Sequence, residues 1–160
     1  MRILMLGNSF TAANDLPQRL AQLTGAEVAA HTRGGARLAE QLNPKTNLGD
    51  RTLTALEGEP WDFVILQEMS HGPISSPQSF FISVKRLCEW IRAKGATPVL
   101  FATWAYEKGG AKLAAKGWNY EDMAQQLSAT YRQAAQENRA LLAEVGQRFY
   151  DLSPTHPLYA

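Results

Sequence analysis

A serine near the amino terminus is the residue of this sequence best placed to do chemistry. Ser9 follows residues 3–6, an unbroken apolar run typical of a strand buried on both faces of a parallel sheet. Gly7 allows a sharp turn after that run, and Asn8 tolerates unusual dihedral angles. Ser9 is therefore expected on a strand-to-helix turn at the carboxyl edge of the sheet, where open parallel sheets bind ligands. Its hydroxyl is a candidate nucleophile; alternatively, Ser9 only caps the following helix.

Other expected strand exits carry residues that a serine nucleophile would need. Such a nucleophile requires hydrogen-bond donors aimed at the oxyanion that develops on its substrate. The backbone N–H groups of Ser9 and Gly35 and the side-chain amide of Gln67 could form this set, with Trp104 and Tyr106 as walls of a substrate pocket. Because parallel strands all end at one edge of their sheet, these residues are expected to meet there.

Each of these residues also has a purely structural interpretation. Gly35 could serve only the turn, Gln67 could bond to neighbouring backbone, and Trp104 could be a core or rim aromatic. Glu68 is equally open between a structural acceptor and a catalytic acid. His71 lies at the right edge, although histidines in loops are usually inert.

The chain alternates strand and helix patterns five times, which predicts an α/β domain of three layers with a parallel sheet. Residues 104–118 are expected to form a long loop, and residues 146–160 an irregular tail. The expected strands are residues 3–6, 26–32, 61–66, 97–103 and 140–145.

Composition narrows the function classes. The chain has 160 residues, 45% of them hydrophobic and 19% charged, as is ordinary for one globular domain. With 16 basic and 15 acidic residues the net charge is +1, which gives no indication of nucleic-acid binding. A single cysteine, Cys88, excludes an internal disulfide and reads as a small buried residue on a helix.

Location and cofactors are also constrained by the sequence. No apolar run approaches the ~20 residues of a membrane-spanning helix. The first strand starts at once and leaves no room for a signal peptide, so a cytoplasmic setting is expected. No cluster of His, Cys and carboxylate residues has ligand spacing, so neither a metal nor another cofactor is expected.

The block of residues 7–11 (GNSFT) resembles the first sequence block of SGNH/GDSL-type serine hydrolases, with Asn8 where many members have Asp. The resemblance implies that Ser9 is the nucleophile. Residues 33–36 (RGGA) are similar to the second block, which implies that the Gly35 N–H belongs to the oxyanion hole. Residues 66–70 (LQEMS) and 103–106 (TWAY) resemble a less studied bacterial branch of the family.

The sequence departs from the family pattern in its third and last blocks. The third is usually Gly-x-Asn-Asp, and Gln67 is the expected substitute for its Asn. The last is Asp-x-x-His-Pro, whereas Asp151 here precedes His156 by five positions. Asp151 and His156 either form a stretched version of the catalytic dyad or belong to a lead-in. The second interpretation is favoured, and it places the true base and a final helix beyond Ala160.

These observations predict a single SGNH-type domain over residues 1–160, without its last catalytic block and helix, and with a flavodoxin-like five-stranded sheet of order 2-1-3-4-5. The expected activity is hydrolysis of a small-molecule ester through an acyl-Ser9 intermediate. Family analogy suggests an acetylated carbohydrate. One alternative is a non-catalytic binding module of the same fold. Another is a phosphate or nucleotide binder that uses residues 7–11 at a helix N-terminus, although no P-loop Lys or Gly-x-Gly-x-x-Gly supports it.

Overall fold

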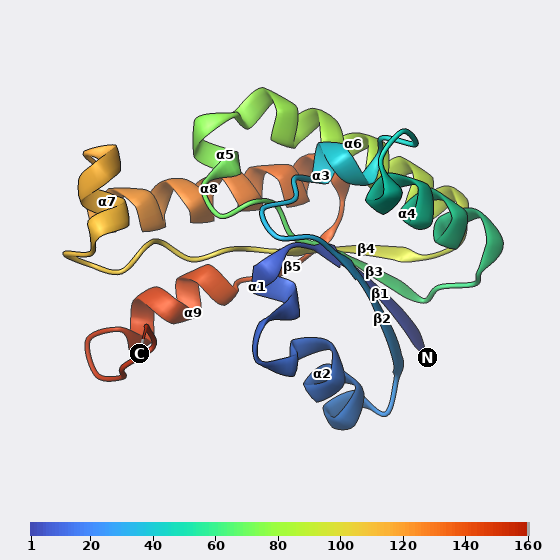
Figure 1. Cartoon of the computed structure of the whole chain (residues 1–160), viewed down its shortest axis with the longest axis horizontal. Helices are drawn as coiled ribbons and strands as arrows, with labels where there is room; N and C mark the ends of the chain where they lie inside the picture. The colour runs from blue at the N-terminus through green and yellow to red at the C-terminus, as the bar shows by residue number, and fades with distance from the viewer. Residues whose placement is uncertain (160) are drawn as a thin grey trace.

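A parallel sheet with helices on both faces organises the chain (Figure 1). A computed structural model describes residues 1–159. Within these residues, five strands lie in the order β2-β1-β3-β4-β5 and all pair in parallel, which confirms the predicted class and strand order. The strands are β1 (Arg2–Gly7), β2 (Glu27–Thr32), β3 (Phe63–Leu66), β4 (Thr97–Phe101) and β5 (Leu141–Ala143).

The helices differ greatly in length, and α6 and α8 are the longest of the described chain. None of the helices in residues 1–159 is both long and apolar enough to cross a bilayer. The helices are α1 (Ser9–Ala12), the 3-10 helix η1 (Ala13–Asp15), α2 (Leu16–Thr24), α3 (Leu38–Gln41), α4 (Asn47–Gly58), α5 (Gly72–Ser75), α6 (Pro77–Ala93), α7 (Ala111–Lys116), α8 (Tyr120–Asn138) and α9 (Val145–Leu152).

One face of the sheet holds the main core. Helices α3, α4, α6 and α8 cover this face, which is the upper one in Figure 1. Alternate strand residues such as Leu4, Val64 and Leu66 point into it and are fully buried. Side chains from α6 and α8, among them Phe80 and Tyr131, complete the cluster, so burial of apolar area fixes these helices on the sheet.

The opposite face is covered less completely. Helices α1, α2 and α9 lie on this side (Figure 1). Ile3 and Met5 of β1 are buried beneath α2, whereas Phe63 and Ile65 of the neighbouring β3 are only partly buried. Leu141 of β5 is 54% exposed. The two faces of the same sheet therefore differ in how much apolar area they remove from water.

Two segments expected to lack regular structure contain helices. Helix α7 lies inside residues 104–118, where Leu113 packs with Tyr120 and Met123. Helix α9 occupies the first half of residues 146–160. Gly146 is expected to start the irregular tail, but it lies inside α9. A Cβ at this position would lie 2.0 Å from the Thr103 carbonyl oxygen, so the close packing of α9 on the β4 exit requires glycine here. The glycine thus reports a close contact with the exit of β4 rather than a break in structure.

The unequal faces give a test within one strand. Leu66→Ala is expected to cost about 2–5 kcal/mol of unfolding free energy, because the side chain is fully buried in the main core. Ile65→Ala removes a side chain from the partly exposed face and should cost at least about 1 kcal/mol less. Urea denaturation of both variants measures the difference. Equal losses would contradict the asymmetry of the two faces.

Candidate active site

Ser9 lies exposed at the carboxyl end of β1, and its neighbour caps the helix that follows. The side-chain oxygen of Asn8 accepts the N–H of Phe10 at 3.0 Å, which makes Asn8 the N-cap of α1. Ser9 is the first residue of that helix. Its hydroxyl makes no hydrogen bond to another group of residues 1–159. The capping role considered for Ser9 therefore belongs to Asn8, and the Ser9 hydroxyl is left facing solvent.

The side chain of Gln67 is buried and does not face a substrate, in contrast to the expected oxyanion-hole role. Its Nε2 donates to the side-chain oxygen of Asn8 at 2.9 Å and to the Glu68 carbonyl at 2.6 Å. Its Oε1 accepts the Asn8 N–H at 3.2 Å and the Thr11 hydroxyl at 2.8 Å. Both amide hydrogens are thus committed inside the protein. We interpret Gln67 as a brace of residues 7–11, called the Ser9 loop below, rather than as an oxyanion donor.

The loop after β2, residues 33–36, lies next to the Ser9 loop. The Asn8 side-chain N–H donates to the Ala36 carbonyl at 3.2 Å and joins the two loops directly. Gly35 is exposed, with a φ of 70° that side-chain-bearing residues rarely adopt. Within the described chain, the backbone N–H groups of Ser9 and Gly35 have no hydrogen-bond acceptor. These two donors remain the candidates for an oxyanion hole.

Aromatic residues gather next to Ser9. The ring of Phe10 stacks on Trp104 with centroids 4.3 Å apart, and the other face of Trp104 stacks on Phe149 at 4.4 Å. Phe10, Trp104 and Tyr106 line a cavity of about 340 Å³, to which Tyr159 also contributes. Trp104 and Tyr106 were expected as pocket walls, and they do line one cavity together with the residue that follows Ser9.

The acidic residue after Gln67 is buried as a structural acceptor. The carboxylate of Glu68 accepts the Met69 N–H at 2.6 Å and the Leu38 N–H at 3.3 Å. Burial raises the pKa of this carboxyl, and the two N–H donors and the nearby charge of Arg37 only partly offset the effect. Of the two interpretations left open by the sequence, this geometry favours the structural one.

His71 contacts a serine and an aromatic ring, and no metal-binding cluster is present in residues 1–159. The ring of His71 lies 2.8 Å from the Ser75 hydroxyl and edge-on to Trp118. Desolvation lowers its pKa, aided by Lys116 and Arg37. Residues 1–159 contain no group of three or more His, Cys, Asp or Glu side chains arranged to hold a metal ion.

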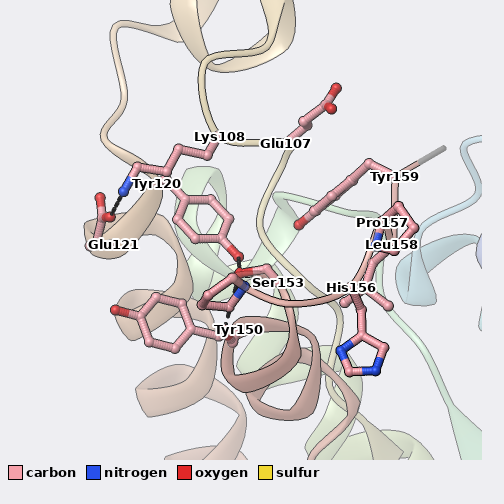
Figure 2. Close-up of a pocket in the computed structure, with 11 residues that line it drawn as sticks. Glu107, Lys108, Tyr120, Glu121, Tyr150, Ser153, His156, Pro157, Leu158 and Tyr159 are labelled. Atoms are coloured by element: carbon pink, nitrogen blue, oxygen red, sulfur yellow. Dashed lines mark hydrogen bonds and ion pairs between the residues drawn. The ribbon is translucent and has the colours of Figure 1, made fainter.

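Asp151 and His156 do not meet Ser9. The ring of His156 contacts the hydroxyl of its neighbour Thr155 at 2.8 Å, and Asp151 accepts from Gln147 at 3.0 Å. Both residues are exposed. His156 lines a second cavity, of about 520 Å³, but Figure 2 shows its imidazole pointing away from the tyrosine rings there. This geometry disfavours the stretched dyad of Asp151 and His156. The alternative, a catalytic base beyond Ala160, lies outside the described residues.

Comparisons with known proteins place this arrangement in a family. No family model and no curated protein matches the chain. Among solved structures, a protein from Slackia heliotrinireducens assigned as an SGNH hydrolase is 52% identical. The match covers 94% of this chain and 82% of that protein, with a TM-score of 0.92. The chain belongs to the SGNH hydrolases.

More distant structures share the fold of this SGNH hydrolase. The esterase EstA from Pseudoalteromonas sp. is 14% identical with a TM-score of 0.66, over 99% of this chain and 84% of its own. The acetyl xylan esterase AlAXEase is 15% identical with a TM-score of 0.67, over 96% and 83% of the two chains. At these identities the likeness concerns the architecture alone.

Sequence reasoning missed the neighbours that hold the SGNH site together. It singled out Ser9, Gly35 and Trp104, but not Asn8 as the helix cap or Phe149 as the partner of Trp104. The Asn8 role had a sequence signal, since Asn is a strong N-cap residue and stands just before the helix. Phe149 had none, because its contact with Trp104 depends on the unexpected helix α9.

The two roles considered for Gln67 predict different variants. If Gln67 braces the loop, Gln67→Ala leaves buried partners unsatisfied at about 1–3 kcal/mol each and lowers the thermal midpoint clearly. Gln78→Ala, at an exposed position of α6, is the matched control and should leave the midpoint unchanged. Scanning calorimetry measures both. An unchanged midpoint with a loss of ~10²–10³ in turnover would restore the oxyanion role.

Proposed function

We propose that this SGNH hydrolase is a serine esterase that acts through an acyl-Ser9 intermediate. The observation that carries the proposal is the division of roles at the end of β1. Asn8 caps helix α1, and Ser9 presents its hydroxyl to solvent at the edge where parallel sheets bind ligands. The family membership supports a hydrolase, and the ester specificity is our inference.

In the proposed reaction the Ser9 oxygen attacks the ester carbonyl carbon, while a base removes the hydroxyl proton. The negative charge on the former carbonyl oxygen is stabilised by the N–H groups of Ser9 and Gly35, which have no partner elsewhere in residues 1–159. Collapse of the tetrahedral species breaks the bond to the alcohol, which leaves with the proton. Water then attacks the acyl-Ser9 ester while the base takes its proton, and that proton returns to the Ser9 oxygen as the acid is released.

The base is the part of this mechanism that residues 1–159 do not supply to Ser9. His156 contacts Thr155, and the ring of His71 contacts Ser75. We therefore propose that the base comes from outside the described residues, in line with the expectation drawn from the last sequence block.

The cavity lined by Phe10, the residue that follows Ser9, suggests the kind of ester. Its walls are the rings of Phe10, Trp104 and Tyr106, with Glu107 and Lys112 at the polar side. Flat aromatic surfaces next to a few polar groups suit a small, partly polar molecule. An acetylated carbohydrate fits this description, and a structural neighbour is an acetyl xylan esterase, so acetylated sugars are the first substrates to test.

A binding module without turnover is the second candidate, and one observation favours it. An activated serine needs an adjacent base, and residues 1–159 place no imidazole against the Ser9 hydroxyl. The exposed loop and the aromatic cavity would then hold an ester or a sugar without cleaving it. Reactivity of Ser9 separates this candidate from the esterase.

Ser9→Ala is expected to reduce hydrolysis of p-nitrophenyl acetate to the uncatalysed rate. The thermal midpoint should stay close to that of the unaltered protein, because the side chain is exposed and makes no hydrogen bond in the described chain. A fluorophosphonate probe should label the unaltered protein and not the variant.

Ser75→Ala is the matched control, since Ser75 is an exposed serine paired with a histidine. It should keep both labelling and turnover. Esterase activity that survives Ser9→Ala would exclude the acyl-Ser9 mechanism. Activity lost in Ser75→Ala would indicate that Ser75 is the nucleophile.

His156→Ala is expected to leave Ser9-dependent turnover and its pH profile essentially unchanged. The physical reason is that the His156 ring contacts Thr155 and is exposed. General bases contribute about 10²–10⁴-fold to rate, so a role as the base would be plain in steady-state kinetics. A loss of that size would establish the stretched Asp151–His156 dyad instead.

A further inference from the structure

Glu68 is a buried carboxylate whose partners come from two different loops. Its exposed fraction is 2%, and it follows the end of β3. It accepts the N–H of the adjacent Met69 at 2.6 Å and the N–H of Leu38 at 3.3 and 3.4 Å from its two oxygens. Leu38 is thirty positions away in the chain, so this contact joins the exit of β3 to the loop after β2.

The N–H of Leu38 is one that the local sequence leaves without a partner. Leu38 is the first residue of α3, and the first N–H groups of a helix have no acceptor within it. The N-cap residue Arg37 makes no side-chain capping bond. Glu68 thus caps this helix from a distant segment and, through Leu38, fixes where the exposed turn at Gly35 ends.

Gln67 and Glu68 are adjacent, and each holds a different loop. Gln67 binds Asn8 and Thr11 of the Ser9 loop, whereas Glu68 binds Leu38 behind the Gly35 turn. We propose that Glu68 is a positioning residue, whose contact with Leu38 sets the Gly35 N–H relative to Ser9. This inference rests on the proposed function, because it assigns the Gly35 N–H to the oxyanion hole.

The packing around Glu68 excludes a direct chemical role. A Cβ placed on Gly72 would lie 2.8 Å from the Glu68 Cγ, so the side chain is closely covered on that side. Its backbone N–H donates to the hydroxyl of the buried Tyr131 at 3.3 Å. With Leu38 and Met69 taking up the carboxylate, Glu68 has no access to a substrate and acts only through the loop.

The test compares Glu68→Ala with Glu68→Gln in the full chain. Glutamine keeps an oxygen that can accept the N–H of Leu38, and alanine does not. Residue-resolved amide exchange should show faster exchange at Leu38 in Glu68→Ala and near-normal exchange in Glu68→Gln. With p-nitrophenyl acetate, kcat of Glu68→Ala should fall by at least about 10-fold, up to the ~10²-fold cost of losing an oxyanion donor, with KM within about two-fold. Glu68→Gln should recover most of kcat.

Glu57→Ala and Glu57→Gln are the matched controls. Glu57 is a carboxylate that also has two donors, Trp90 and Lys94, but it is exposed on α4. These variants should change neither kcat nor exchange at Leu38. They measure the cost of removing a paired carboxylate in general.

Several results would overturn the proposal. Unchanged exchange at Leu38 in Glu68→Ala would show that Glu68 does not hold the loop, and fast exchange with unchanged kcat would show that the loop position is irrelevant to catalysis. If Glu68→Ala does not fold, Glu68→Gln decides: normal exchange with a large loss of kcat refutes positioning, and retained kcat supports it. If Ser9→Ala leaves hydrolysis intact, the proposed function fails, while the exchange at Leu38 still decides whether Glu68 anchors the loop.

Discussion

One buried amide ties together the sheet edge at which the candidate site lies. The Gln67 side chain reaches Asn8 and Thr11, which are 59 and 56 positions away in the chain. The contact is possible because β1 and β3 are neighbours in register, with Leu6 opposite Leu66, so their exits leave the sheet side by side. A parallel sheet brings distant loops to one edge, and here a fully satisfied side chain then locks two of them together.

The groups that hold the site and the groups that could do chemistry are different residues with different burial. Gln67 and Glu68 are 1% and 2% exposed, whereas Ser9 and Gly35 face solvent. Among residues 1–159 no buried side-chain nitrogen or oxygen lacks a hydrogen-bond partner. Buried polar groups that are all paired are costly to rearrange, because each broken bond leaves an unsatisfied group at low dielectric. These paired buried groups therefore hold the exposed loops in place, so the Ser9 hydroxyl and the N–H groups of Ser9 and Gly35 keep their positions without contacts of their own.

The sequence was sufficient for the features that depend on periodicity and on strand exits. Apolar runs located all five strands of the described chain, and the strand order was predicted from the fold that the family resemblance implies. The same reasoning placed Ser9 and Gly35 in neighbouring loops, which the Asn8 to Ala36 bond confirms.

The role of Gln67 could not be predicted from periodicity or from its place at a strand exit. A side-chain amide beside a nucleophile looks the same in sequence whether its N–H groups face a substrate or the protein, and the deciding partners are more than fifty positions distant. Helix α9 was missed for a similar reason, because the close approach of Gly146 to Thr103 is a tertiary contact.

The same kind of contact explains why the chain's own late histidine does not reach the nucleophile. Tyr159 donates its hydroxyl to the Ala105 carbonyl at 2.5 Å and sets its ring edge-on to Phe149, 5.9 Å away. The first contact joins the segment after α9 to the exit loop of β4, and the second joins it to α9. Phe149 stacks on Trp104, and Trp104 stacks on Phe10. His156 is three positions before Tyr159, and its ring contacts the hydroxyl of Thr155. A base for Ser9 would have to approach the β1 exit by another route than this anchored segment.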